Sequence, residues 1–325
     1  MTSVLSVKNL VVDFDTPRGL LHAVRDVDLE VPEGSSVGIV GESGSGKTVM
    51  SRAAMGLLRG QSVHRSGTVI FDGKELTKMS PDDVRNEFGT GMAMIFQDPM
   101  TALNPVRRIG SQLGEGLRIR LGMDKKAAIE RSKELLAFVR IPDPEEMLRK
   151  FPNQLSGGMR QRVMIAIAIA CNPKLLFADE PTTALDVTVQ AQILDLLSDL
   201  RQELSMSMVL VTHDLGVVAN HTDYISVMYA GQVVEHAPTK QLFANTKMPY
   251  TEALMKSIPR LDMPSGQRLP VISGRLPDPT KPEPGCPFAN RCPYVQNQCR
   301  TEAPPMVLAG PQHGYRCWFP IGGAH

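Results

Sequence analysis

Short apolar runs and longer helical patterns alternate through much of the chain. Ser36–Val40 and Leu175–Ala178 are apolar runs with the length of buried strands. Val49–Leu58 has the pattern of a helix that closes near a glycine, and Lys125–Val139 places apolar residues at helical spacing. Together these elements predict an α/β fold.

One apolar run has an ambiguous period. Ile165–Ala170 alternates isoleucine and alanine, a period of two that is typical of strands. All six side chains are apolar, so the alternation does not distinguish a solvent-exposed face from a buried one. Alanine favours helix, and a buried helix can be apolar all round, so we predict a helix here.

The pattern also divides the chain into regions. Residues 1 to about 97 are expected to contain an antiparallel β portion, in which Asp72-Gly73 is a hairpin turn signal. The pattern is helical from about 98 to 154, and residues 155 to 237 complete the core. We therefore predict one domain over residues 1–237, with a mainly helical segment at about 98–154, and an extension over 238–325.

The extension differs from the rest of the chain. Met248–Pro259 predicts a short helix with proline at its start. The segment after it is predicted to be irregular and extended because prolines accumulate there. Those prolines are Pro259, Pro264, Pro270, Pro277, Pro279, Pro282 and Pro284.

Composition narrows the possible functions. The 325 residues include 35 basic and 34 acidic ones, a net charge of +1, which gives no electrostatic case for nucleic acid. The longest apolar run, Val163–Cys171, is far shorter than the ~20 residues that span a bilayer. Met1–Lys8 lacks the features of a signal peptide. We expect a soluble, cytosolic chain whose membrane partners are other chains.

Residues 41–48 read GESGSGKT and fit the G-x-x-x-x-G-K-[ST] phosphate-binding pattern without a mismatch. The segment lies between a predicted strand and a predicted helix, as the motif requires. Backbone N–H groups and the helix N-terminus would surround phosphate oxygens, Lys47 would reach the β- and γ-phosphates, and the Thr48 hydroxyl would bind Mg²⁺. The predicted nucleotide-binding residues are Gly41, Ser43, Gly44, Ser45, Gly46, Lys47 and Thr48.

Two acids follow the second apolar strand. Asp179 and Glu180 are expected at its C-terminal end, the edge at which open α/β sheets bind ligands. Asp179 would hold Mg²⁺, and Glu180 would act as the general base on the attacking water.

In order along the chain, these motifs resemble those of ATP-binding cassette (ABC) ATPases over residues 1 to about 237. The matching segments are Gly41–Thr48, Gln97, Leu155–Gln161, Asp179-Glu180, 184–186 (ALD) and His213. The resemblance implies an α/β P-loop ATPase with an antiparallel β subdomain and a helical subdomain that carries the 155–161 signature.

The resemblance also implies roles. Gln97 would sense Mg²⁺ and the γ-phosphate, and His213 would contact the γ-phosphate. Ser156, Gly157 and Gly158 would complete the site of an opposing subunit, and Asp186 would cross that interface. Phe14 is the candidate that stacks on adenine, although the insertion 15–22 blurs the alignment there.

Four of the five cysteines lie in the extension, at Cys286, Cys292, Cys299 and Cys317, with the spacing C-x5-C-x6-C-x17-C. With the segments 97–105 and 248–251, this tail resembles that of dipeptide/oligopeptide importer ATPases, which implies a 4Fe-4S cluster that staples the extension. Zn²⁺ and unligated thiols remain alternatives. Cys171, at the end of an apolar helix, is expected to be a buried small hydrophobe.

The resemblance therefore implies an ATP-hydrolysing subunit that energises peptide import, with ATP and Mg²⁺ as cofactors. Its partners would be a second, paralogous ATPase, two permease subunits and an extracytoplasmic peptide-binding protein. It would lie on the cytoplasmic face of the inner membrane. The alternatives are an importer ATPase for nickel or another small solute, a soluble ABC ATPase, and a non-catalytic module.

Overall fold

The computed structural model describes residues 2–183, 185–258 and 272–322. Pro259, Pro264 and Pro270 of the predicted irregular segment lie outside these residues. By its internal contacts the chain divides into two compact units. One comprises residues 1–4, 32–35 and 79–210, and the other comprises 5–31, 36–78 and 211–325.

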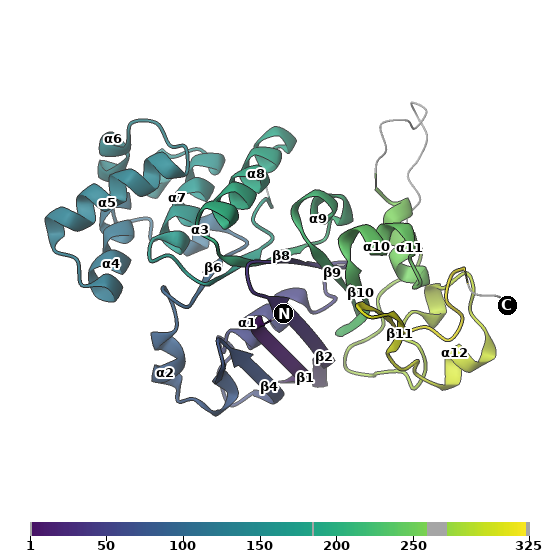
Figure 1. Cartoon of the computed structure of the whole chain (residues 1–325). Coiled ribbons are helices and arrows are strands. Elements are labelled where there is room, and N and C mark those ends of the chain that lie inside the picture. Colours follow the sequence, from purple (N-terminus) through teal and green to yellow (C-terminus); the bar gives the residue numbers. More distant parts are fainter. Residues whose placement is uncertain (1, 184, 259–271, 323–325) are drawn as a thin grey trace. The chain divides into compact units, whose positions relative to one another are not determined.

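The first unit contains most of the helices. They are α2 (Pro81–Asn86), α3 (Pro99–Ala102), α4 (Ile109–Leu121), α5 (Lys125–Phe138), α6 (Pro144–Arg149), the 3-10 turn η2 (Pro152–Gln154), α7 (Gly157–Ile169) and α8 (Val187–Glu203). Helices α4, α5 and α6 pack on one another (Figure 1). Asp124 caps α5 by accepting from Ala127 N, which fixes where that helix begins.

The strands of the first unit are β6 (Met92–Ile95), β7 (Leu175–Asp179) and β8 (Ser207–Thr212), whose last two residues belong to the second unit. β6 and β7 pair in parallel, and β8 is the other neighbour of β7. All five residues of β7 are buried, as the continuous apolar run predicts. Ile165–Ala170 lies almost wholly within α7, so the predicted helix is confirmed.

The second unit contains a four-stranded antiparallel sheet in the order β2-β1-β4-β5. Its strands are β1 (Ser3–Thr16), β2 (Gly19–Pro32), β4 (Val63–Phe71) and β5 (Lys74–Glu75). Asp72 and Gly73 both have positive φ and join β4 to β5, which confirms the predicted hairpin. The turn η1 (Leu76–Lys78) follows.

A second set of strands in this unit has the order β11-β12-β10-β9-β3. The strands are β3 (Ser36–Val40), β9 (Tyr224–Tyr229), β10 (Gln232–Pro238), β11 (Val307–Gly310) and β12 (His313–Tyr315). β3 pairs with β9 in parallel, and β10 pairs with β9 and β12 in antiparallel fashion. The helical elements are α1 (Lys47–Ala54), α9 (Leu215–His221), α10 (Thr239–Ala244), α11 (Pro249–Lys256), η3 (Ala289–Arg291) and α12 (Asn297–Thr301).

The extension is more regular than its prolines predict. Residues 272–288 form neither helix nor strand, as expected, but the hairpin β11–β12 pairs with the core strand β10. The sequence does not show this hairpin because strands of four and three residues are too short to establish an alternation. The expected short helix with proline at its start is confirmed as α11, which has Pro249 in its first turn and ends at Lys256, before the predicted end at 259.

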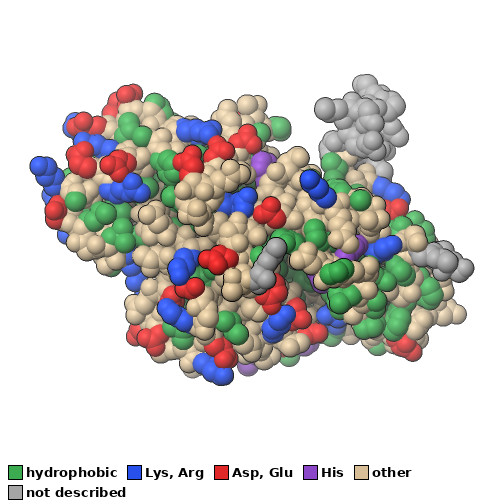
Figure 2. Space-filling model, viewed as in Figure 1, with side chains coloured by type: hydrophobic (Ala, Val, Ile, Leu, Met, Phe, Trp, Pro, Cys, Tyr) green, Lys and Arg blue, Asp and Glu red, His purple; other side chains and the backbone are tan. Residues whose placement is uncertain are grey.

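In the described part of the chain, no helix is both long enough and apolar enough to cross a bilayer. The space-filling view shows acidic and basic side chains interspersed, consistent with the near-zero net charge (Figure 2). Cys171 is buried just after α7, as expected, and burial raises its pKa.

Candidate functional site

The phosphate-loop sequence, residues 41–48, lies between β3 and α1 in the second unit. It packs tightly against its own surroundings. A Cβ atom on Gly41 would overlap the carbonyl oxygen of Met228, and one on Gly46, whose φ is +100°, would lie 2.5 Å from Ala23 O. Glycine is therefore required at both positions, because no other residue brings the backbone this close.

Lys47 is buried, with 4% of its surface exposed. Its Nζ donates to the carbonyl oxygens of Gly41 (2.8 Å) and Glu42 (3.0 Å). The ammonium group thus lies inside the curve of the loop, where a phosphate-binding lysine is needed. Ser45 Oγ is buried and has no hydrogen-bond partner among the described residues, which leaves it available to a bound phosphate.

The acidic end of β7 carries local backbone strain. Asp179 is fully buried, and Glu180, the next residue, has φ +46°, a left-handed conformation that glutamate rarely adopts. Such strain clusters at functional sites. The Glu180 carboxylate accepts hydrogen bonds from Gln97 Nε2 (2.9 Å) and Thr183 Oγ1 (3.0 Å). Gln97 and Glu180, predicted from separate motifs, are therefore in contact.

Thr183 was not among the predicted site residues. Its position, three residues after Glu180, is the only signal that could have identified it. The hydroxyl restricts the carboxylate to one orientation, as a general base requires.

The signature segment begins α7. Ser156 is the N-cap, and its hydroxyl accepts from Met159 N at 3.3 Å. Cβ atoms on Gly157 and Gly158 would lie 3.3 Å from Leu185 Cδ2 and 2.9 Å from Val189 Cγ1. The glycines therefore allow α7 to approach the start of α8. The helix N-terminus keeps free N–H groups and positive dipole, which favour an anion.

Asp186, Phe14 and His213 stay predictions as ligands. Asp186 caps α8 by accepting from Val189 N at 3.0 Å, a structural role that coexists with any contact to a partner. Phe14 lies within β1, half-buried, opposite Val63 of β4. The expected insertion at 15–22 comprises the end of β1, a two-residue turn and the first residues of β2. His213 follows β8 and is exposed.

The predicted residues are divided between the two units. Gln97, Ser156–Gly158, Asp179-Glu180 and Asp186 belong to the first unit. The phosphate loop, Phe14 and His213 belong to the second.

The four cysteines of the extension surround one small cavity of about 20 Å³. Its walls are aromatic or apolar, and no carboxylate lines it. Burial, the largest cause, raises the pKa of Cys286 to about 11 and that of Cys317 to about 12, and it also raises the pKa of Cys292. Hydrogen bonding by the backbone of Phe288 and Ala289 offsets part of the rise in the pKa of Cys286, and Ala289 N donates to the carbonyl oxygen of Cys286 at 2.9 Å.

The four cysteines that were predicted to hold a metal cluster do not form a metal-ion site in the structure. In residues 2–183, 185–258 and 272–322, no group of three or more His, Cys, Asp or Glu side chains could hold a metal ion as placed. All five cysteines are free thiols. The four thiols thus share one cavity without converging on a single ion position.

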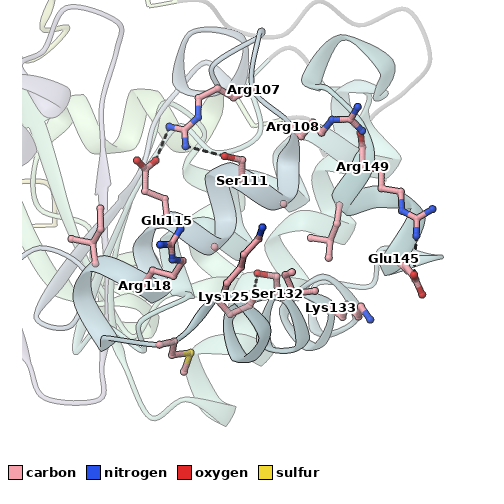
Figure 3. A pocket seen from close by; sticks show the side chains of 17 residues that line it. Arg107, Arg108, Ser111, Glu115, Arg118, Lys125, Ser132, Lys133, Glu145 and Arg149 are labelled. Atoms are coloured by element: carbon pink, nitrogen blue, oxygen red, sulfur yellow. Dashed lines mark hydrogen bonds and ion pairs between the residues drawn. The ribbon is translucent and has the colours of Figure 1, made fainter.

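A groove of about 810 Å³ lies among α4, α5 and α6 (Figure 3). Six lining side chains are Arg or Lys and two are Glu. Arg107 pairs with Glu115 at 2.7 Å, and Arg149 pairs with Glu145 at 3.0 Å. None of the predicted site residues lines this groove, so it is separate from the nucleotide motifs.

Comparisons with known proteins agree with this geometry. Residues 24–183 match the ABC transporter family, and residues 234–299 match the family described as "Oligopeptide/dipeptide transporter, C-terminal region". A solved structure, the dimeric post-hydrolysis state of the ATP-binding cassette MJ0796 bound to ADP and Pi, has a TM-score of 0.65. It is 28% identical and covers 72% of this chain and 98% of its own.

Two curated relatives from Bacillus subtilis (strain 168) match nearly the whole chain. The dipeptide transport ATP-binding protein DppD is 47% identical over 98% of this chain and 95% of its own length. The oligopeptide transport ATP-binding protein OppD is 45% identical over 98% of this chain and 89% of its own length.

The phosphate loop, the strained carboxylate after β7 and the capped glycine pair of α7 define an ABC-type ATPase. The two relatives match nearly the full length of this chain at 45–47% identity, so the family within the ABC-type ATPases can be assigned. The chain belongs to the family of dipeptide and oligopeptide transport ATP-binding proteins.

Proposed function

We propose that this chain is the ATP-hydrolysing subunit of a membrane transporter that imports dipeptides or oligopeptides. The observation that carries the proposal is the match to peptide-transport relatives through the extension as well as the cassette. That match favours peptides over nickel or another small solute. A soluble ABC ATPase and a non-catalytic module are disfavoured by the same match.

In the proposed mechanism, residues 41–48 hold the phosphates of ATP, with Lys47 on the β- and γ-phosphates and Phe14 against adenine. Thr48, Gln97 and Asp179 would hold Mg²⁺, which would neutralise negative charge on the phosphates. Glu180 takes a proton from the attacking water, in an orientation fixed by Gln97 and Thr183. His213 contacts the γ-phosphate and keeps the geometry of attack.

The proposed assembly contains a second ATPase, two permease subunits and an extracytoplasmic peptide-binding protein. Ser156–Gly158 complete the partner's nucleotide site, and Asp186 lies at that interface. ATP stabilises the closed pair of ATPase subunits, and hydrolysis reopens it. Because the closed pair binds ATP more tightly than the open pair, ATP binding and hydrolysis drive a conformational change in the permease. The chain is peripheral, on the cytoplasmic face of the inner membrane.

The test is Glu180→Gln in the purified complex. We expect the variant to bind ATP and trap a closed pair but to lose turnover, because glutamine cannot accept the water proton. Glu203→Gln, an exposed glutamate at the end of α8, is the matched control and should hydrolyse ATP normally. Wild-type turnover in Glu180→Gln contradicts the general-base assignment.

We also propose that Cys286, Cys292, Cys299 and Cys317 hold a 4Fe-4S cluster that stabilises the extension. The four thiols that line one cavity without any carboxylate are a donor set that fits such a cluster. Zinc fits less well, because it needs four sulfurs at ~2.3 Å from one ion. The purified complex should be brown and lose its absorbance in Cys286→Ser, but not in Cys171→Ser. A colourless, zinc-loaded protein refutes the cluster.

A further inference from the structure

Arg291 connects the cysteine cavity to the phosphate loop. It ends η3, the short turn between the cavity cysteines Cys286 and Cys292. Its guanidinium forms a two-pronged ion pair with Glu42, the second residue of the loop. Nη1 lies 2.6 Å from Oε2 and Nη2 lies 2.8 Å from Oε1.

The guanidinium is held from all sides. Besides the two bonds to Glu42, Nε donates to Ser273 O (2.9 Å), Nη1 to Tyr229 OH (3.3 Å) and Nη2 to Ile272 O (3.0 Å). These bonds use all five N–H donors of the side chain. Only 4% of the Arg291 side chain is exposed, against 28% of the Glu42 side chain. A lysine cannot reproduce this planar fork.

The backbone of Glu42 forms hydrogen bonds both within the phosphate loop and to the extension. Its carbonyl oxygen accepts from Lys47 Nζ (3.0 Å) and from Ser45 N (3.1 Å). Its own N–H donates to Tyr250 OH at 2.9 Å. Tyr250 packs against Tyr229 and Phe288 with ring centroids 4.5 and 5.3 Å apart. A shift of Glu42 therefore moves the acceptor of the phosphate-binding lysine.

Phe288 completes the connection. It lines the cysteine cavity and also packs edge-on against Tyr229, over which the Arg291 guanidinium lies at 5.8 Å. The extension also lies beside Gly44 of the loop, where a Cβ atom would be 3.5 Å from Leu276 Cδ1. Further on, Pro279 O accepts from His22 N of β2 at 3.0 Å.

We propose that Arg291 is a positioning residue for nucleotide binding, which holds the phosphate loop and neutralises Glu42, and so makes ATP affinity depend on the folded extension. This inference rests on the proposed phosphate-binding role of residues 41–48. The Glu42 carboxylate is covalently part of an anion-binding loop, so without Arg291 its charge repels the triphosphate. The lost fork also frees the loop backbone, which costs ATP further binding energy.

The test is a double-mutant cycle on the purified complex, with binding of a fluorescent ATP analogue as the readout. We expect Arg291→Met to raise Kd about tenfold or more, with a matching rise in the KM for ATP and a smaller change in kcat. Arg291→Lys should recover part of the affinity, because the charge remains. In a Glu42→Gln background, Arg291→Met should change Kd less than about twofold, because there is no charge left to neutralise.

Arg316→Met is the matched control. Arg316 also precedes a cavity cysteine, and it pairs the extension with Asp26 of β2 at 3.4 Å, not with a residue of the loop 41–48. Its Kd should stay within about twofold of wild type. The proposal is overturned if Arg291→Met leaves Kd unchanged, or if it raises Kd equally with and without Glu42→Gln, as a purely structural role would. Failure of the wild type itself to bind ATP refutes the underlying function instead.

Discussion

Glu235→Gln tests how the extension is joined to the rest of the second unit. Glu235 is fully buried in β10, directly after a shift at Val234 in the register between β10 and β9. One carboxylate oxygen accepts from Lys247 N (2.7 Å) and His313 Nε2 (2.9 Å), and the other accepts from Met248 N (3.1 Å). The carboxylate thereby connects β10 to the residues that precede α11 and to the first residue of β12.

The cost of the change follows from these bonds. Glutamine keeps one acceptor oxygen, but its NH₂ group faces a donor, so at least one buried N–H loses its partner. The amide oxygen is also a weaker acceptor than the carboxylate for His313, which is 1% exposed. An unsatisfied buried donor costs about 1–3 kcal/mol. We therefore expect Glu235→Gln to lower the free energy of unfolding by about 2 kcal/mol.

The assay is urea-induced unfolding followed by tryptophan fluorescence. The chain has one tryptophan, Trp318, and its Nε1 donates to Glu302 O within the extension, so the signal reports on this region. Glu30→Gln is the control, because Glu30 pairs with Lys8 at an exposed site and should cost about 0–1 kcal/mol. If Glu235→Gln unfolds within about 1 kcal/mol of Glu30→Gln, the reasoning is wrong.

Three further predictions concern the loop, the signature and pH. Gly41→Ala should abolish ATP binding, because the new methyl overlaps Met228 O, while Gly114→Ala, whose Cβ would make only ordinary contacts at 3.9 Å or more, should keep it. Gly158→Ala should lower the ATPase rate of the complex about tenfold by pressing on Val189, and Val189→Ala should restore it. The pKa of His236 is lowered from its ordinary value of 6.5, mainly by burial and secondly by the charge of His313. Asp28 has a smaller effect in the opposite direction. Its neutral form therefore contributes stability that is present above pH 6.5 and is lost as the pH falls through the lowered pKa. Urea unfolding at pH 7 and 5 should show a smaller loss in His236→Gln than in wild type, and equal losses contradict the assignment.

Local features were predictable because their causes are local. The glycines of residues 41–48, the apolar run of β7 and the Asp72-Gly73 turn each have a signature within a few residues of sequence. The predicted helix over 165–170 is correct because alanine content and uniform burial outweigh the apparent period of two.

Long-range pairs left no local signal. Arg291 and Glu42 are 249 positions apart, and His313 and Glu235 are 78 apart. A basic or acidic residue in a proline-rich or strand segment gives no sign of its partner, so the contact between extension and phosphate loop could not be predicted. The hairpin β11–β12 was missed for a similar reason, because pairing with β10 stabilises strands that are too short and irregular to recognise.

The most direct measurement of the proposed function is uptake of a labelled dipeptide into proteoliposomes that contain the complete transporter, with ATP supplied to the ATPase side. We predict that wild-type complex accumulates peptide only with ATP and Mg²⁺. Complex with Glu180→Gln should bind ATP and accumulate none. Equal uptake by the two complexes, or wild-type ATP hydrolysis that never moves peptide, would contradict the claim that hydrolysis by this chain drives peptide import.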